Sequence, residues 1–580
     1  MNDYLNNLKN NLFKIIDDLI DKNIIDKNFD KNNISLDYFS KSKKANVSSN
    51  ILILLKNKIK DNFQIEDYIL ENIKNLDFIY DVFISKGNFI NVFFKEEYIL
   101  DFLSKVFISP SNYGESNEGK NKKINVEFVS ANPTGPIHIA HIRGAVFGDV
   151  ISSIYEATGY DVTREYYVND SGSQIKILGN SLFKRYSELF DIEISFLDNE
   201  YPGKYLILIA KIIKDKDGNK WLNYDLNKRE KYFEKFAVDY LVNKIKEDLN
   251  SINIKFNKFT YESDIIKKQT IDEVFAILKE KNLLFEGYLD KPKGEEKTNW
   301  KPKKQLLFKS SKFNDDQDRA IKKENGDWTY FANDAAYHYD KFKRNYFKLI
   351  NVWGADHIGY INRMKSIVEV CSNQNNYLDV QICQLVRLIS KGKTLKMSKR
   401  EGNFVTLKEL LDKVGKDSIR YYMISTKNVT PMDFNLDKVV EKNKDNQVFY
   451  CQYAYARASS VINKSKNLNQ FENFENNFSK FNYNSLSPYE KEIILKIISW
   501  PYLLNQSSYL RQPHKIINYI EDISSSFHSF WNMGKNDESL RMLDSSNIEK
   551  TTSKLFWVQA FRIVMKKAFD IIGIEAIENM

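Results

Sequence analysis

A strand, a tight turn and the start of a helix follow one another directly between residues 124 and 159. This order constrains the fold more than any other feature. Residues 124–129 alternate apolar and polar side chains, which is typical of a half-buried strand. Turn-forming residues 132–136 follow, and apolar residues at helical spacing continue to Gly159. A helix start exposes unpaired backbone N–H groups and the positive end of the helix dipole, so this segment predicts a site for a phosphate chain.

Two histidines lie at the start of this predicted helix. His138 and His141 are three residues apart, which places both imidazoles on one helix face. From there both can donate hydrogen bonds to the same phosphate while negative charge builds up on it. Taken alone, such a pair is more often an ordinary surface or core pair, or a chance resemblance to a metal site that lacks a third ligand.

A lysine cluster far along the chain could serve the same phosphates. Lys396 and Lys399 can place two positive charges on the outer phosphates, and Ser398 can donate a hydrogen bond. In a chain with 86 Lys and Arg residues, however, such a cluster alone is usually a solvated surface. Residues 392–394 look like the end of a P-loop, but Arg387 occupies the position of its first glycine, which excludes that motif.

The sequence around these two elements resembles the arginyl-tRNA synthetases, a family of class I aminoacyl-tRNA synthetases. The resemblance covers nearly the whole chain and is weakest in the first hundred residues and in the lysine-rich stretch 291–304. The matching segments are residues 127–136, 143–146, 165–172, 201–206, 318–319, 328–334, 352–357, 359–360, 396–403 and 452–457. Each motif is weak alone, and their common order is what favours the family.

The resemblance implies an ATP-dependent ligase that attaches L-arginine to tRNA(Arg). The arginine carboxylate would attack the α-phosphorus of ATP, assisted by Mg²⁺, to give arginyl-adenylate and diphosphate. The 3′-terminal adenosine of the tRNA would then accept the arginyl group through its 2′-hydroxyl, with release of AMP. The family generally needs tRNA for the first step, and a monomer is the family-based expectation.

The same resemblance implies which residues contact each substrate. The catalytic residues would be His138, His141, Lys396 and Lys399. ATP would be bound by His138, Ala140, His141, Gly144, Lys396, Met397, Ser398 and Lys399. Arginine would be bound by Glu127, Asn132, His138, Tyr330, Asp334 and His357. The tRNA would be bound by Tyr450, Gln452, Tyr453 and Arg457.

Physical chemistry agrees with the arginine assignment. A guanidinium group offers a planar fork of donors that carboxylates accept in pairs, so Asp334 and Glu127 are the best candidates to hold it. Tyr330 lies one helical turn before Asp334 and could stack or hydrogen-bond beside the same group. Such a site would disfavour lysine, because lysine leaves a carboxylate incompletely paired.

Two positions depart from the family pattern. Ala140 stands where the histidine motif usually has glycine, which adds one methyl group where an adenine could lie close. Arg400 stands where the class-wide lysine motif has serine, which adds a positive charge. Because alanine is the mildest replacement for glycine, we expect activity to persist.

The net charge and the cysteines restrict the cellular compartment and the binding partners that we expect. The formal net charge of +9 leans toward polyanionic partners but is a weak field over 580 residues. The three cysteines form no Cys-x-x-Cys pair, so the sequence predicts neither structural zinc nor a disulfide framework. The N-terminus does not read as an apolar leader, and no window is apolar enough for a bilayer. We therefore predict a cytoplasmic protein with no membrane partner.

The chain is too long for one compact core, so several domains are expected. The predicted fold class is multidomain α/β. It combines a doubly wound, Rossmann-like parallel sheet with an α+β N-terminal domain and an all-α C-terminal anticodon-binding bundle. The predicted domains are 1–110 (N-terminal, tRNA-contacting), 120–380 (catalytic, with an insertion at about 185–300), 381–435 (lysine loop and connector) and 436–580 (helical).

Two alternatives stay open at this point. One is a class I synthetase for another amino acid, such as cysteine, against which the lack of zinc-ligand cysteines argues. The other is a synthetase-like tRNA-binding protein without catalysis. The intact His138, His141, Lys396 and Lys399 argue against it, because a binding protein has no need of groups that act on phosphates.

Overall fold

The computed structural model describes most of the chain, which divides into two compact units. The residues described are 3–38, 45–56, 58–59, 63–289, 303–395, 405–441, 443, 445–471, 473–476 and 478–580. Residues 396–400, the predicted lysine cluster, therefore lie outside the described residues. The first unit comprises residues 1–118, 157–159 and 442–580, and the second comprises residues 119–156 and 160–441.

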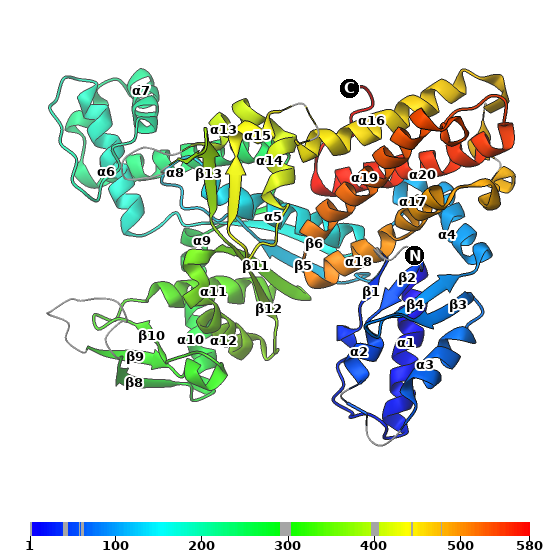
Figure 1. The fold of residues 1–580 in the computed structure, drawn as a ribbon. Helices are drawn as coiled ribbons and strands as arrows, with labels where there is room; N and C mark the ends of the chain where they lie inside the picture. Colours follow the sequence, from blue (N-terminus) through cyan, green and yellow to red (C-terminus); the bar gives the residue numbers. More distant parts are fainter. Residues whose placement is uncertain are drawn as a thin grey trace. The chain divides into compact units, whose positions relative to one another are not determined.

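Five parallel strands form the central sheet of the second unit (Figure 1). They are β5 (Lys123–Glu127), β6 (Asp161–Val168), β7 (Lys258–Tyr261), β11 (Lys348–Gly354) and β12 (Leu378–Cys383), in the order β12-β11-β5-β6-β7. The predicted doubly wound parallel sheet is confirmed. Because the strand order reverses between β5 and β11, a ligand is expected at the carboxyl ends of these two strands.

Helices connect these strands and carry the predicted site residues. α5 (Ile139–Ala157) follows β5, α11 (Tyr330–Lys343) precedes β11, and α12 (Ile361–Ser372) lies between β11 and β12. Between β11 and α12 the chain forms the short 3₁₀ helix η5 (Ala355–Tyr360). The helix α5 begins directly after the turn, and its apolar residues Ile142, Val146, Val150 and Ile154 are fully buried, as their spacing predicts.

The chain between β6 and α11 forms two substructures. The helices α6 (Ser173–Glu188), α7 (Tyr205–Asp217) and α8 (Leu226–Ser251) share a core of their own, which includes Tyr186, Leu206 and Phe233. After β7 come α9 (Glu262–Lys267) and α10 (Thr270–Glu280). An antiparallel sheet then follows, made of β8 (Leu284–Tyr288), β9 (Lys304–Phe308) and β10 (Arg319–Lys322).

A smaller sheet follows the parallel one. Its strands β13 (Val386–Ser390) and β15 (Met432–Asn435) run parallel, and β14 (Lys393–Thr394) pairs with β13 as an antiparallel hairpin. The helices α13 (Leu407–Val414) and α14 (Lys416–Met423) lie between β14 and β15, and α15 (Leu436–Val439) ends the unit. The strand β14 of this sheet leads into the lysine cluster, and the chain after the cluster continues into α13.

The first unit contains the N-terminal α+β fold that was predicted. Its antiparallel sheet has the order β1-β2-β4-β3, with β1 (Leu36–Asp37), β2 (Val47–Ser49), β3 (Ile79–Ile84) and β4 (Ile90–Phe94). Its helices are α1 (Tyr4–Asp21), α2 (Ile51–Leu55), α3 (Ile65–Lys74) and α4 (Glu96–Ile108). The helix α1 buries Leu5, Leu8, Leu12 and Leu19, which recur at the spacing of one helix face.

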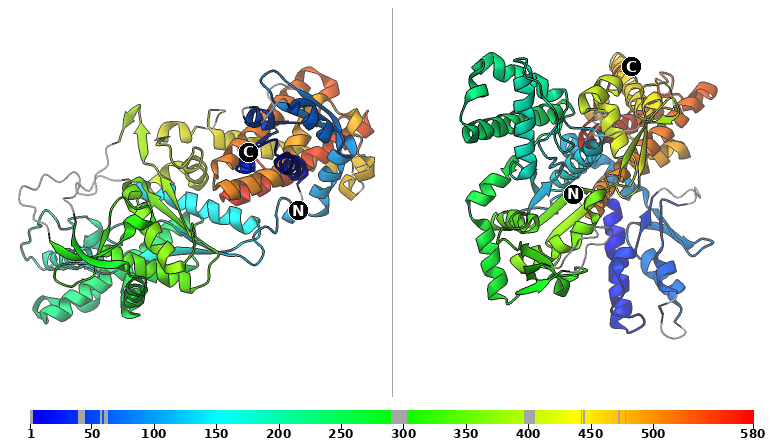
Figure 2. Two further views of the ribbon diagram at one scale, coloured as in Figure 1. Left: turned by 90° about the horizontal axis from the view of Figure 1, so that it is seen from below. Right: turned by 90° about the vertical axis from the view of Figure 1, so that its left-hand side faces the viewer.

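The predicted C-terminal helical bundle belongs to the same unit and is confirmed. It consists of α16 (Gln447–Lys466), α17 (Pro488–Ile498), α18 (Trp500–Leu510), α19 (His514–Asn536) and α20 (Ile548–Ile572). The helix α16 packs against both α19 and α20, and the yellow-to-red helices stay bundled in both views of Figure 2. Across the described ranges, we find no helix with the length and apolar character needed to span a membrane.

Candidate active site

The turn between β5 and α5 holds a strained backbone at the reversal of strand order. Val129 and Ser130 have φ angles of +67° and +38°, which side chains other than glycine rarely adopt. Hydrogen bonds hold the strain in place, because the Ser130 hydroxyl donates to the Glu127 carboxylate (3.0 Å) and accepts from the backbone N–H of Tyr167 (3.1 Å). The turn is therefore a fixed element from which Asn132 and the following helix project.

The structure brings the two predicted histidines together. The ring centroids of His138 and His141 lie 3.9 Å apart with an interplanar angle of 30°. Both rings are half-buried at the N-terminus of α5, whereas Ala140 between them is exposed. The pair therefore lies where the helix dipole and the first N–H groups favour an anion.

The chain that leaves the lysine cluster lies beside these histidines. Thr406 forms an isolated β-bridge with His138, and the backbone N–H of Leu407 donates to the Ile137 oxygen at 3.0 Å. Thr406 also caps α13 through a reciprocal pair of hydrogen bonds with Glu409, which fixes the end of this segment. The segment that resumes after residues 396–404 is thus joined to the start of α5.

The carboxylates of Asp334, Glu127 and Glu262 lie close together near the carboxyl end of β5. Asp334, on the first turns of α11, is half-buried and accepts a hydrogen bond from the Tyr360 hydroxyl (2.9 Å). Burial raises the pKa of Asp334 to about 7, the Tyr360 hydrogen bond opposes this rise, and the charges of Glu262 and Glu127 add to it. In the described part of the chain, no cationic side chain forms an ion pair with Asp334.

Glu127 differs from Asp334 because a cation within the protein already compensates it. The buried Lys341 ammonium donates to Glu127 and to the Asn351 side-chain oxygen (3.2 Å). The Asn351 amide donates to Nε2 of His338 (2.8 Å), whose Nδ1 in turn donates to the Asp334 main-chain oxygen (2.8 Å). Burial and the Lys341 charge lower the pKa of His338 to about 4, so the imidazole is neutral. This network joins β5, β11 and α11.

A second ion pair fixes the C-terminal end of α11. The Arg344 guanidinium donates to both carboxylate oxygens of Glu165, at 2.7 and 2.9 Å. Asn125 and Thr260 each donate a further hydrogen bond of 2.6 Å to the same carboxylate. Burial alone would raise the pKa of Glu165, but the Arg344 hydrogen bonds and the charges of Lys341 and Arg344 lower it to about 2. The helix that carries Asp334 is therefore held rigidly on the sheet.

The other predicted arginine contacts lie after β5, at the start of α11 and after β11. Asn132 is exposed; its amide donates to the Gln174 side chain, and its oxygen accepts from the Asn169 amide, both at 2.9 Å. Tyr330 begins α11 and is 66 % exposed. His357 is exposed after β11, with its ring centroid 6.3 Å from that of Trp353.

A cavity of about 270 Å³ adjoins the acidic cluster and reveals two residues that sequence reasoning missed. Glu262 lines it, is buried, and accepts from the Asn333 amide at 3.2 Å. Tyr167 lines it as well, stacks on Tyr337 at 3.9 Å, and has no hydrogen-bond partner for its hydroxyl among the described residues. Tyr167 belonged to a matched segment, but nothing in the sequence pattern placed Glu262 near Asp334.

The predicted tRNA contacts lie on α16. The Arg457 guanidinium donates to the Tyr453 hydroxyl (3.1 Å) and to Nδ1 of His528 (3.0 Å), and lies 4.1 Å from the Tyr453 ring centroid. The Tyr450 and His528 ring centroids are 4.4 Å apart, so rings and cation form one cluster. Gln452 is buried, and its amide donates to the Glu575 oxygen at 3.0 Å. This contact does not test a role in tRNA binding, which stays a prediction.

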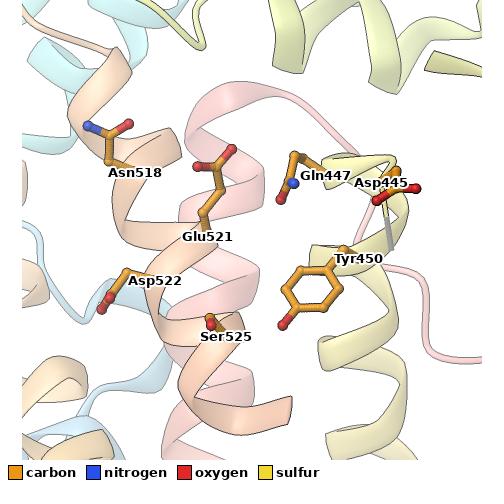
Figure 3. A pocket seen from close by; sticks show the side chains of 7 residues that line it. All are labelled: Asp445, Gln447, Tyr450, Asn518, Glu521, Asp522 and Ser525. Carbon is orange, nitrogen blue, oxygen red and sulfur yellow. The ribbon is translucent and has the colours of Figure 1, made fainter. Parts of the chain in front are cut away.

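An acidic groove of about 540 Å³ lies between α16 and α19, beside Tyr450 (Figure 3). It is lined by Asp445, Gln447, Tyr450, Asn518, Glu521, Asp522 and Ser525. Its three carboxylates, those of Asp445, Glu521 and Asp522, make the groove acidic, and Asp522 is paired with the Lys496 ammonium at 2.6 Å.

The described ranges contain no candidate metal cluster, and their cysteines are buried. No group of three or more His, Cys, Asp or Glu side chains there is arranged to hold a metal ion. Cys371, Cys383 and Cys451 are buried, and none of them forms a disulfide bond with another described residue.

Two family models match the chain. One is described as tRNA synthetases class I (R), catalytic domain, and matches residues 103–452. The other is described as DALR anticodon binding domain and matches residues 451–580. Together they cover both the unit with the parallel sheet and the helical bundle.

Individual relatives agree with these matches. Arginine–tRNA ligase of Pelagibacter ubique is 40 % identical over 559 residues, which is 95 % of this chain and 95 % of that protein. The corresponding ligase of Ehrlichia chaffeensis is 35 % identical over 547 residues, or 94 % of each chain. The structure of Thermus thermophilus arginyl-tRNA synthetase has a TM-score of 0.71 at 17 % identity, covering 94 % of this chain and 96 % of that one, and shows the shared fold.

Proposed function

This chain belongs to the class I arginyl-tRNA synthetase family and is an arginine–tRNA ligase. We propose that Asp334 is the main contact of the substrate guanidinium. The observation that carries this proposal is the acidic cluster of Asp334, Glu262 and Glu127. Lys341 compensates Glu127, whereas Asp334 has no cationic partner among the described residues. A guanidinium bound beside Asp334 would supply the missing charge, and the Tyr360 hydroxyl would hold the carboxylate in place.

Three further residues are proposed to contact the arginine. Asn132 projects from the strained turn and would accept from the substrate α-amino group, with His357 near the same group. Tyr330 would cover the guanidinium from the start of α11. Glu127 would act on the guanidinium at a distance, through its negative charge and not by direct contact, because its oxygens already accept from Lys341 and Ser130.

The phosphates of MgATP would lie at the N-terminus of α5. In the proposed reaction the arginine carboxylate attacks the α-phosphorus in line, and the bond to the leaving diphosphate breaks. His138 and His141 donate hydrogen bonds to the phosphates as their charge grows, and His138 also touches the carboxylate. Ala140 and Gly144 would lie against the nucleotide, where Gly144 leaves room because a Cβ there meets only Val352, at 3.8 Å.

Lys396, Met397, Ser398 and Lys399 are proposed to complete the ATP site. Support comes from the described chain on the far side of the cluster, which is joined to Ile137 and His138 at Leu407 and Thr406. Diphosphate then leaves, and the terminal adenosine of tRNA(Arg) attacks the acyl carbon of arginyl-adenylate, releasing AMP. A need for tRNA in the first step is part of this proposal.

The tRNA is proposed to meet α16 through Tyr450, Tyr453 and Arg457, with Gln452 behind them. Ring faces and a guanidinium bind unstacked bases in single-stranded loops. A monomeric state and a cytoplasmic location complete the proposal; the location suits three cysteines that form no disulfide bond among the described residues.

The assignment of substrate and phosphate groups is tested by charging each labelled amino acid onto total tRNA with MgATP. Wild type is expected to charge arginine alone. The Lys396→Ala, Lys399→Ala double variant is expected to lose about a hundredfold in rate, because two charges that stabilise the leaving diphosphate are gone. Charging of another amino acid would overturn the substrate, and tRNA binding without any charging would favour a non-catalytic tRNA-binding protein.

The α16 surface is tested by Tyr453→Ala. We expect KM for tRNA to rise about tenfold, because one stacking face is lost, while KM for arginine is unchanged. The control is Tyr509→Ala, which removes an exposed tyrosine of α18 in the same unit. An equal rise of KM for tRNA in both variants would contradict a specific role of α16 in tRNA binding.

A further inference from the structure

Arg143 is a buried guanidinium on α5 that joins this helix to two distant segments. It is only 1 % exposed. Its Nη1 donates to the main-chain oxygens of Gln384 (3.0 Å) and Thr430 (2.7 Å). Its Nη2 donates to the main-chain oxygen of Lys427 (2.9 Å) and the hydroxyl of Thr426 (3.1 Å). One side chain therefore satisfies four acceptors from two segments.

These acceptors lie where the smaller sheet begins. Gln384 links β12 to β13, and residues 426–430 lead into β15. The two segments also bond to each other, since the Gln384 N–H donates to the Asn428 oxygen (2.8 Å) and the Met432 N–H to the Leu385 oxygen (3.1 Å). Any shift of this junction relative to α5 therefore moves the whole β13–β15 pair.

The chemistry of the contact requires arginine. All four acceptors are neutral, and within the described residues no carboxylate forms an ion pair or hydrogen bond with Arg143. The charge is thus not used to neutralise an acid. A planar guanidinium can serve two sets of acceptors at fixed angles, whereas the single ammonium of lysine cannot reach both.

We propose that Arg143 is a positioning residue for adenylate formation, which sets the β13–β15 pair against the N-terminus of α5. The inference rests on the proposed function, because that function places the ATP phosphates at this helix start. Arg143 follows His141 by two residues on α5. The described chain leaves the smaller sheet at β14 before residues 396–404, and after them Thr406 forms a bridge with His138, so Arg143 and this bridge are two separate contacts between the start of α5 and the segments around the lysine cluster. Misplacement by about 1 Å at such a junction is enough to slow a positioned reaction by about a hundredfold.

The test is arginine-dependent ATP–diphosphate exchange by the full-length enzyme with saturating tRNA, comparing wild type, Arg143→Ala and Arg143→Lys. Both variants are expected to lose about thirtyfold in kcat, with KM for arginine changed by less than about twofold, because positioning and not arginine binding is lost. Methylguanidinium is expected to restore activity to Arg143→Ala by about fivefold or more, and to leave Arg143→Lys unchanged.

The matched control is Arg420→Ala. Arg420 is equally buried and donates to Asp149 of the same α5 (2.6 Å) and to the Ile252 oxygen (2.8 Å), but it joins α5 to α14 and not to the smaller sheet. It is expected to lower the thermal midpoint as Arg143→Ala does, while kcat stays within about threefold of wild type.

Three results would overturn the inference: equal losses of kcat in Arg143→Ala and Arg420→Ala, full activity of Arg143→Lys, or a rise in arginine KM alone. If Arg143→Ala does not fold, the kcat of Arg143→Lys decides. Absence of exchange in wild type overturns the proposed function instead, so the two failures are distinguishable.

Discussion

Asp334→Asn is expected to lower kcat/KM for arginine by about a thousandfold, because a buried carboxylate that pairs with a cationic ligand contributes several kcal/mol. The same variant is expected to be more stable than wild type. The enzyme without arginine holds this carboxylate half-buried, near Glu262 and Glu127 and without a cation. Asparagine keeps the hydrogen bond from Tyr360 and removes the charge.

The pH dependence of the free energy of unfolding shows why Asp334→Asn should be the more stable protein. The pKa of Asp334 is about 7 in the folded protein and 3.8 as its ordinary value, so the folded state holds a proton between these limits that the unfolded state has lost. The stability from this proton is fully present below pH 3.8 and is lost as the pH rises to about 7. At about pH 8, Asp334→Asn should therefore raise the free energy of unfolding by about 2–4 kcal/mol, and less at about pH 5.

Arginine binding should show the opposite pH dependence. Below about pH 7 the free enzyme carries a protonated Asp334, and a guanidinium must displace that proton to bind. The affinity for arginine should fall about tenfold for each pH unit below 7, and this slope should disappear in Asp334→Asn. Calorimetric titration and thermal unfolding of both proteins measure the two effects. Asp327→Asn, which changes an exposed carboxylate just before α11, is the control, and a variant that binds arginine normally would refute the assignment of Asp334.

Arg344→Ala is expected to destabilise the catalytic unit by about 3–5 kcal/mol, because it leaves the Glu165 carboxylate buried without its cation. In wild type the pKa of Glu165 is about 2, below the ordinary 4.5. Its contribution to stability is therefore present above pH 4.5 and is lost only as the pH falls through about 2. Without Arg344 the same carboxylate favours its protonated form, so the variant should gain stability when the pH is lowered from about 7 to about 5.

A double-mutant cycle separates the ion pair from general damage at this position. Glu165→Gln in the Arg344→Ala background removes the uncompensated charge and should recover about 2 kcal/mol or more. Chemical denaturation of the four proteins at about pH 7 measures the coupling. Additive losses would mean that the pair contributes no more than ordinary packing. Because Arg344 ends the helix that carries Asp334, we also expect KM for arginine to rise in the single variant.

Local patterns determined much of this protein. The alternation at 124–129, the turn at 132–136 and the helical spacing beyond it predicted β5, a turn and α5, but β5 ends at Glu127, and the strained φ angles of Val129 and Ser130 were not predicted. The spacing of His138 and His141 predicted their adjacent rings, which lie 3.9 Å apart. Such features depend on neighbours within one helical turn or one strand, so they can be predicted from the sequence alone. The order of the motifs along the chain identified the family and hence the reaction.

Only the tertiary structure decided how charges are shared across the site. Glu127 and Asp334 looked equivalent in the sequence. In the structure Lys341 compensates the charge of Glu127, whereas the negative charge of Glu262, at the start of α9, raises the pKa of Asp334. Arg143 finds its acceptors more than 240 residues away, at the junction of β12, β13 and β15. Periodicity encodes which residues form an element and which face they share. The partner that a buried charge meets depends on how distant elements pack, because a pairing in a low-dielectric interior is set by contact distance and burial and not by separation along the chain.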